Sequence, residues 1–178
     1  MHSKGIIHGN LKGVWFWTLT SALPSDSLST KANVVIDQGG HPRLTDFGLL
    51  TIILDHTTYF TGGSAPADGP IRWMSPELIS ESRPTKKSDC YGLGMVIYEV
   101  LAGKPPFARL SDYIVAERVK KGEHPERPRG AEGAWFTDDL WVMLRQCWKP
   151  DANNRPSIED VRECLEHVSS TWKPPPRR

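Results

Sequence analysis

The chain has 178 residues, of which 38% are hydrophobic and 24% are charged, and its formal net charge is +1 at pH 7. This length and apolar content allow one domain with a sizeable core. The small net charge argues against nucleic acid or an anionic membrane as the main partner, because such binding needs clustered excess base. The sequence contains no run of 18 apolar residues, so we expect no membrane-spanning segment.

The cysteines and the first ten residues both indicate a cytoplasmic protein. Cys90, Cys147 and Cys164 are few, odd in number and not spaced as metal ligands, so we interpret them as reduced structural thiols. The first ten residues contain no long apolar segment of the kind that secretory signals carry.

The first 31 residues do not have the pattern of a complete domain start. Residues 1–7 have the character of a helix end that closes at Gly5, so we expect the beginning of the domain to be missing. Residues 8–13 are a polar loop. Residues 14–31 run from the aromatic cluster Trp15-Phe16-Trp17 into a Ser/Pro-rich stretch without helical or strand periodicity.

A short β-hairpin is predicted next. Residues 33–37 form a β-branched strand, residues 38–40 form a turn, and residues 42–45 form the partner strand. The residues Asp46-Phe47-Gly48 follow directly. Residues 49–70 are a long loop rich in Thr, Gly, Ser and Pro, and loops of this length in compact domains are commonly functional.

The stretch from Ser88 to Gly103 is predicted to be the central helix. Its apolar residues face every side of a helical wheel, which is typical of a buried helix. Ser88 is expected to cap its start and Gly103 to end it. Gly92 and Gly94 lower helix propensity, so they indicate close approach by neighbouring backbone.

Three amphipathic helices are predicted beyond the central one, at residues 111–121, 137–148 and 157–168. The last begins with the capping box Ser157-x-x-Asp160. Residues 171–178 are expected to be an extended Pro/Arg-rich tail. The predicted fold class is therefore α+β and mainly helical, with one short β-hairpin.

Several separated motifs resemble those of protein kinases, in the family's order. They are His8–Lys12 with Asn33, Asp46-Phe47-Gly48, and Ser75-Pro76-Glu77, which resemble the catalytic loop, the metal-binding DFG segment and the APE-type segment. The central helix resembles the family's buried F helix. Cys147-Trp148 with Arg155-Pro156 is similar to tyrosine kinases and their tyrosine-kinase-like (TKL) relatives. The resemblance spans residues 1–170 and implies a kinase large (C-terminal) lobe, with the small lobe absent.

The resemblance implies ATP and Mg²⁺ as cofactors and a protein as substrate or partner. Asp46 would hold the Mg²⁺ that bridges the phosphates, Asn33 would make a second metal contact, and Lys12 would stabilise charge on the transferring phosphoryl group. Asp89 would orient the backbone of the catalytic loop. Glu77 would pair with Arg155 and so lock the activation segment, to which the resemblance also assigns Phe47, Gly48, Ser75 and Pro76.

Three features depart from the family's pattern. No G-x-G-x-x-G segment precedes the catalytic loop, so half of the ATP site is expected to be missing. Asn10 stands where the family has its catalytic aspartate, and an amide cannot accept a proton. Residues 14–31 are an insertion, since removing them restores the family's spacing between Asn10 and Asn33. The insertion is either an untranslated sequence retained in the gene model or a genuine loop.

These observations leave three interpretations of function open. In the first, the chain is a fragment, inactive alone, of a kinase that phosphorylates Ser, Thr or Tyr hydroxyls. In the second, it is a pseudokinase-type binding lobe. In the third, it is a truncated gene-model product. With no small lobe, apolar groups near Ile6, Val35 and Phe47 are expected to be partly bared. Such a surface predicts marginal stability or self-association.

Overall fold

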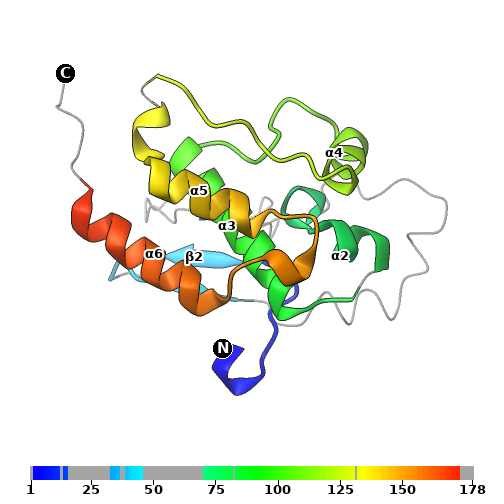
Figure 1. Cartoon of the computed structure of the whole chain (residues 1–178), viewed down its shortest axis with the longest axis horizontal. Coiled ribbons are helices and arrows are strands. Elements are labelled where there is room, and N and C mark those ends of the chain that lie inside the picture. The colour runs from blue at the N-terminus through cyan, green and yellow to red at the C-terminus, as the bar shows by residue number, and fades with distance from the viewer. Residues whose placement is uncertain are drawn as a thin grey trace, which may run out of the picture.

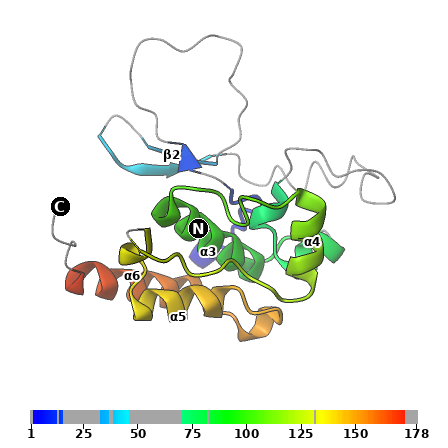
Figure 2. The same cartoon turned by 90° about the horizontal axis from the view of Figure 1, so that it is seen from above.

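The computed structural model describes residues 2–12, 14–15, 33–36, 39–45, 70–81, 83–130 and 132–172. Within these ranges the α+β, mainly helical fold class is confirmed. A layer of strands lies on one side of a group of helices, and α3 (Lys86–Ala102) runs through the middle of that group (Figures 1 and 2). None of the helices in the described part is long and apolar enough to cross a membrane.

Besides α3, the described residues form 3₁₀ turns, short strands and further α-helices. The 3₁₀ turns are η1 (His2–Lys4), η2 (Pro70–Trp73), η3 (Glu132–Trp135) and η4 (Ala152–Asn154). The strands are β1 (Val14–Trp15), β2 (Val34–Ile36) and β3 (Pro42–Leu44). The other α-helices are α2 (Pro76–Glu81), α4 (Asp112–Lys120), α5 (Asp138–Cys147) and α6 (Ile158–Thr171).

The sheet confirms the predicted hairpin and adds one strand to it. β2 and β3 are antiparallel, with Val34 opposite Leu44 and Ile36 opposite Pro42. β1 lies on the other side of β2 in parallel, with Val14 opposite Val34. The prediction of no strand at the start of residues 14–31 is therefore wrong for β1. A strand of two residues is too short to leave a period-two pattern, and pairing with β2 decides its conformation.

Helix α3 is confirmed as the buried central helix, but its start differs from the prediction. Thr85, not Ser88, is the N-cap: the Thr85 hydroxyl accepts the backbone N–H of Ser88 at 3.0 Å, and the Ser88 hydroxyl accepts the N–H of Thr85 at 2.8 Å. The two residues form a reciprocal capping box, so Ser88 lies inside the first turn. The end is as predicted, with Gly103 in the left-handed conformation at φ 63°.

Other segments approach both glycines of α3 closely, but the predicted approach by backbone holds for Gly92 alone, since the atoms nearest to Gly94 belong to side chains. A Cβ added at Gly92 would lie 3.3 Å from the Leu11 Cβ and 3.3 Å from the Trp73 carbonyl oxygen. A Cβ added at Gly94 would lie 2.8 Å from the Trp148 Nε1. Glycine therefore lets the loop around residue 11, the η2 turn and helix α5 pack directly on α3.

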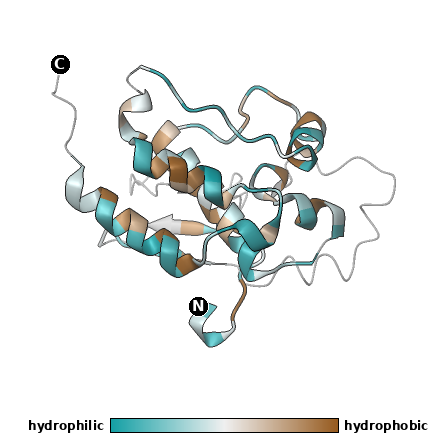
Figure 3. Cartoon of the chain, viewed as in Figure 1, coloured by the Kyte–Doolittle hydropathy of each residue, from teal (hydrophilic) through white to brown (hydrophobic). Residues whose placement is uncertain are grey.

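The three outer helices are confirmed, and each packs an apolar face inward. Helix α6 ends at Thr171, three residues beyond its predicted end, so the first residue of the predicted tail is helical. Ser111, Thr137 and Ser157 are the N-caps of α4, α5 and α6, and α6 has the predicted capping box. Figure 3 shows hydrophilic and hydrophobic residues on different sides of α5 and α6. Large core side chains, all at most 5% exposed, are Ile71, Met74, Leu78, Tyr91, Met95, Phe136, Leu140, Leu144, Trp148 and Val161.

Helix α2 was not predicted. It has six residues, fewer than two turns, so it carries no readable periodicity. Pro76 stands at its first position, where a missing N–H costs nothing and the fixed φ favours the helix. That local signal was present in the sequence.

Candidate active site

The loop of residues 8–12 is held on the first turn of α3 by one buried carboxylate. Asp89 is 3% exposed, and its two oxygens accept the backbone N–H groups of His8 and Gly9, each at 2.8 Å. The ring of His2 adds a third contact, from Nε2 to Asp89 Oδ2 at 2.8 Å. A carboxylate with three N–H partners fixes both the position and the direction of the loop backbone.

His8 joins this loop to the end of the hairpin. Its side chain is fully buried, and its Nε2 donates to the carbonyl oxygen of Thr45 at 2.9 Å. Its Nδ1 accepts the backbone N–H of Asn10 at 3.3 Å, which places the ring proton on Nε2. These roles of His2 and His8 have no signature in the sequence, because their partners lie 87 and 37 residues away along the chain.

Asn33 lies against the loop although 22 residues separate it from Asn10 in the sequence. Its side-chain N–H donates to the carbonyl oxygen of Asn10, and its backbone N–H donates to the carbonyl oxygen of Lys12 at 2.9 Å. Its own carbonyl accepts the N–H of Thr45 at 2.9 Å. The insertion therefore separates Asn33 from the loop in sequence but not in space, because Asn33 bonds directly to Asn10 and Lys12.

Two buried amide oxygens of this loop and its partner strand have no hydrogen-bond partner among the described residues. They belong to Asn10, which is 8% exposed, and to Asn33, which is 1% exposed. Unpaired buried polar atoms are costly, so each calls for a ligand or another function. An amide oxygen is also a hard donor of the type that Mg²⁺ prefers, so the Asn33 oxygen fits the metal contact expected of it. Asp46, Phe47 and Gly48 lie outside the described residues.

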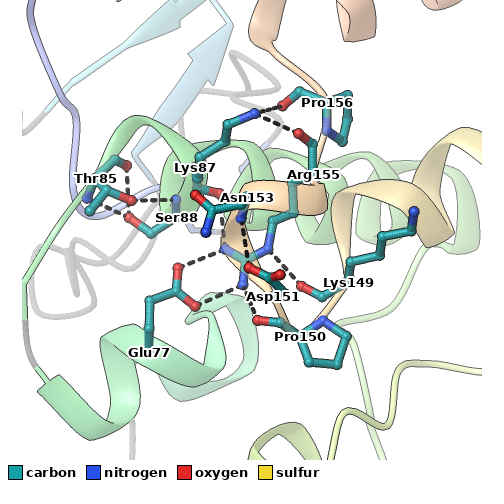
Figure 4. Close-up of polar contacts among 10 residues, drawn as sticks. All are labelled: Glu77, Thr85, Lys87, Ser88, Lys149, Pro150, Asp151, Asn153, Arg155 and Pro156. Atoms are coloured by element: carbon teal, nitrogen blue, oxygen red, sulfur yellow. Dashed lines mark hydrogen bonds and ion pairs between the residues drawn. The ribbon is translucent and has the colours of Figure 1, made fainter.

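Glu77 and Arg155 form a bidentate ion pair (Figure 4). Arg155 donates from Nη1 to Glu77 Oε1 at 2.6 Å and from Nη2 to Glu77 Oε2 at 2.7 Å. Burial alone would raise the pKa of Glu77, but the hydrogen bonds and positive charge of Arg155 outweigh it and hold the pKa below its usual range. The pair joins the start of α2 to the turn before α6. Ser75 and Pro76 adjoin Glu77, and Ser75 is fully buried.

The η2 turn is anchored by two side chains of its own. Arg72 donates to the carbonyl oxygens of Phe107 at 2.7 Å and Leu110 at 2.6 Å, and it pairs with Asp112 at 2.9 Å. Trp73 Nε1 donates to Glu99 Oε2 at 3.1 Å. No motif in the sequence predicts these contacts.

Comparison with known proteins identifies the family. Residues 28–165 match the family model described as protein tyrosine and serine/threonine kinase, which covers more than three quarters of the chain. The chain belongs to the protein kinase family. It is 33% identical over 139 residues to the serine/threonine-protein kinase VIK of Arabidopsis thaliana. It is 31% identical over 167 residues to the cytokinesis protein sepH of Aspergillus niger, and 28% identical over 137 residues to the tyrosine-protein kinase Abl of Drosophila melanogaster.

The aligned part is most of this chain and a small part of each relative. It comprises 78%, 94% and 76% of this chain, but only 31%, 10% and 8% of VIK, sepH and Abl, respectively. The family-model match covers α2 to α5 and most of α6, and it begins after the loop of residues 8–12. The structure brings together Asn10, Lys12, Asn33 and Asp89 in one group, and Glu77 with Arg155 in another.

Proposed function

We propose that this chain is the large lobe of a protein kinase domain whose family activity is ATP-dependent phosphorylation of protein hydroxyls, and that these 178 residues alone do not turn over. The observation that supports the proposal is the conformation and composition of the loop of residues 8–12. Its backbone is held by Asp89 and completed by Asn33, yet an asparagine occupies the position of the proton acceptor. Asn10 can hydrogen-bond a substrate hydroxyl but cannot take its proton.

The loss of a general base is large enough to decide activity. General-base catalysis contributes roughly 10²- to 10⁴-fold. The remaining catalytic effect in phosphoryl transfer is positioning and charge neutralisation, which ATP-bound Mg²⁺ supplies when present. In this chain Asn33 and Asp46 would hold that metal, and Lys12 would stabilise the transferring group. The 178 residues contain no G-x-G-x-x-G segment to cover the phosphates.

A second candidate is a pseudokinase-type binding lobe. The Glu77–Arg155 pair and the Asp89 contacts keep the framework ordered without the proton acceptor, which favours a role in holding a partner. Two segments indicate different acceptor residues for the family's reaction. Lys12 is similar to Ser/Thr kinases, whereas residues 70–74 are similar to tyrosine kinases. That mixture is the reason for proposing TKL membership.

We also propose that the protein is cytoplasmic, and its cysteines support this. All three are free thiols in the structure, and Cys90 and Cys147 are buried. Burial raises the pKa of Cys90 to about 11 and that of Cys147 to about 12. Both thiols therefore stay protonated at neutral pH and act as small apolar core residues.

The proposal is tested by incubating the 178-residue chain with radiolabelled ATP, Mg²⁺ and a generic protein acceptor. We expect no phosphate transfer above a protein-free control. Transfer that disappears in the Asn33→Ala variant would overturn the proposal, because it would show that the isolated lobe catalyses the reaction through its metal contact.

A further inference from the structure

Phe107 has a strained backbone conformation in the turn between α3 and α4. Its φ is 54°, and it is the one residue other than glycine with a left-handed backbone in the described part of the chain. A side chain crowds the backbone in this conformation, which lowers its population roughly 5- to 30-fold. Such conformations persist only where the surroundings impose them, and they are common in segments that switch. Neighbouring groups must therefore hold Phe107 in place.

Arg72 of the η2 turn holds the backbone on both sides of Phe107. Its Nη1 donates to the carbonyl oxygens of Pro106 at 3.0 Å and Phe107 at 2.7 Å, and its Nη2 donates to that of Leu110 at 2.6 Å. The same Nη2 pairs with Asp112, the first residue of α4, at 2.9 Å. The two side chains are 16% and 15% exposed, so salt screens their pairing little. One guanidinium thus fixes three carbonyl groups and the start of α4 from η2.

The side chains of Phe107 and Leu110 explain why the turn does not use glycine. Both are partly buried against the hydrophobic core. A glycine at position 107 would adopt the left-handed conformation without strain, but it would lose the packing of the ring. The strained turn is therefore sustained by the packing of these side chains together with the hydrogen bonds from Arg72, and without Arg72 only the packing remains.

The turn leads directly into an exposed surface at the start of α4, which lies beside α2 (Figure 1). Tyr113 and Ile114 follow Asp112 in the first turn of α4 and are 75% and 44% exposed. Val115 and Val119 on the same helix are fully buried, which keeps α4 on the core. The start of α4 can therefore change conformation while the rest of the helix stays packed.

We infer that Arg72 is a conformational strap, a side chain that couples the η2 turn to the start of α4 through the strained turn at Phe107. With Arg72 in place, residue 107 is left-handed. When Arg72 is withdrawn, residue 107 relaxes to a negative φ, and residues 104–113 change conformation while the core stays folded. The strap needs neither nucleotide nor phosphoryl transfer, so it is tested separately from the function proposed above.

Comparing glycine with alanine at position 107 measures the sign of φ there. Phe107→Gly and Phe107→Ala both remove the ring, but only alanine is strained in the left-handed conformation. With Arg72 present, chemical denaturation should give Phe107→Ala an unfolding equilibrium constant at least threefold larger than that of Phe107→Gly. In an Arg72→Gln background the order should reverse, because alanine is the more stable of the two at a negative φ. The same order in both backgrounds would overturn the inference.

Arg127→Gln is the matched control. Arg127 likewise donates to a carbonyl oxygen, that of Phe136, and to a carboxylate, that of Asp138, but it does not contact the turn at Phe107. The order of the glycine and alanine variants should therefore stay unchanged in the Arg127→Gln background, and a reversal there would contradict the role of Arg72.

Hydrogen exchange followed by mass spectrometry locates the change. Arg72→Gln should exchange faster than the parent in residues 104–113, with α5 and α6 as protected as in the parent. Global unfolding of Arg72→Gln, or a uniform loss of protection, would overturn the inference, because a strap releases the turn and spares the core.

Discussion

The guanidinium of Arg155 ties together segments that lie far apart in the sequence. Its side chain is fully buried, and each of its five N–H groups has an acceptor: two oxygens of Glu77 and the carbonyl oxygens of Lys149, Lys87 and Pro150. The ring of Tyr91 lies 5.1 Å from the guanidinium carbon. A buried charge of this kind is stable only while every donor stays paired.

Glu77→Gln should therefore destabilise the fold strongly. The variant keeps a similar shape but leaves the buried Arg155 charge unpaired, which costs about 3 kcal/mol. Chemical denaturation of both proteins measures the difference. Asp138→Asn is the control, because Asp138 pairs with Arg127 at an exposed site and should cost about 1 kcal/mol or less. Equal losses in the two variants would contradict this account.

Glu99 should make stability fall as pH rises toward neutral. Burial raises the pKa of Glu99 from 4.5 to about 7, and the hydrogen bond from Trp73 only partly opposes that shift. Between those pH values the folded state holds a proton that the unfolded chain has released, so stability decreases with rising pH. Glu99→Gln still accepts the Trp73 hydrogen bond but cannot ionise. Thermal unfolding from pH 4.5 to 8 should show a weaker decline in the variant than in the parent, and parallel curves would contradict the assignment.

At the scale of elements, the sequence predicts those helices and strands whose hydrophobic pattern is long enough to repeat. The buried α3 and the amphipathic α4, α5 and α6 are found because each extends over two turns or more. The strand β1, with two residues, and the helix α2, with fewer than two turns, are missed because neither is long enough to repeat its pattern. The wrong cap on α3 has a different cause: Thr85 and Ser88 are both good capping residues, and their reciprocal hydrogen bonds make the earlier one the cap.

The insertion should be removable without loss of the fold. Deleting residues 14–31 would make Lys12 and Asn33 the first and fourth residues of a β-turn, and the 2.9 Å bond from Asn33 N–H to the Lys12 carbonyl is the bond that closes such a turn. Shortening the loop from about 20 residues to 2 also lowers the closure cost by about 2 kcal/mol, against the loss of the two-residue strand β1.

Thermal unfolding of this deletion variant should show a midpoint equal to or above that of the parent. A deletion of 18 residues from the α5–α6 region serves as a control that should unfold the chain. Loss of cooperative unfolding in the 14–31 variant would contradict the turn geometry and would make the insertion part of the fold.

At the scale of the whole molecule, motifs with fixed chemistry placed the candidate site better than periodicity did. Asp89, Glu77, Arg155 and Asn33 were singled out by their place in motifs, and their partners are now defined by distances. The His2–Asp89 and Trp73–Glu99 contacts left no signal, because contacts across 87 and 26 residues depend on the folded packing. Ile6 is 47% exposed, as expected, while Phe47 and the side chain of Val35 lie outside the described part of the chain.

The central claim is that the catalytic loop is assembled and lacks only its proton acceptor. The most direct measurement uses a chimaera in which the small lobe of a related kinase precedes this chain. It compares phosphate transfer by the parent chimaera with transfer by its Asn10→Asp variant. We predict a rise of roughly 10²- to 10⁴-fold in the variant, which Asp46→Asn should remove. A parent that already transfers phosphate at the rate of the Asn10→Asp variant would contradict the claim.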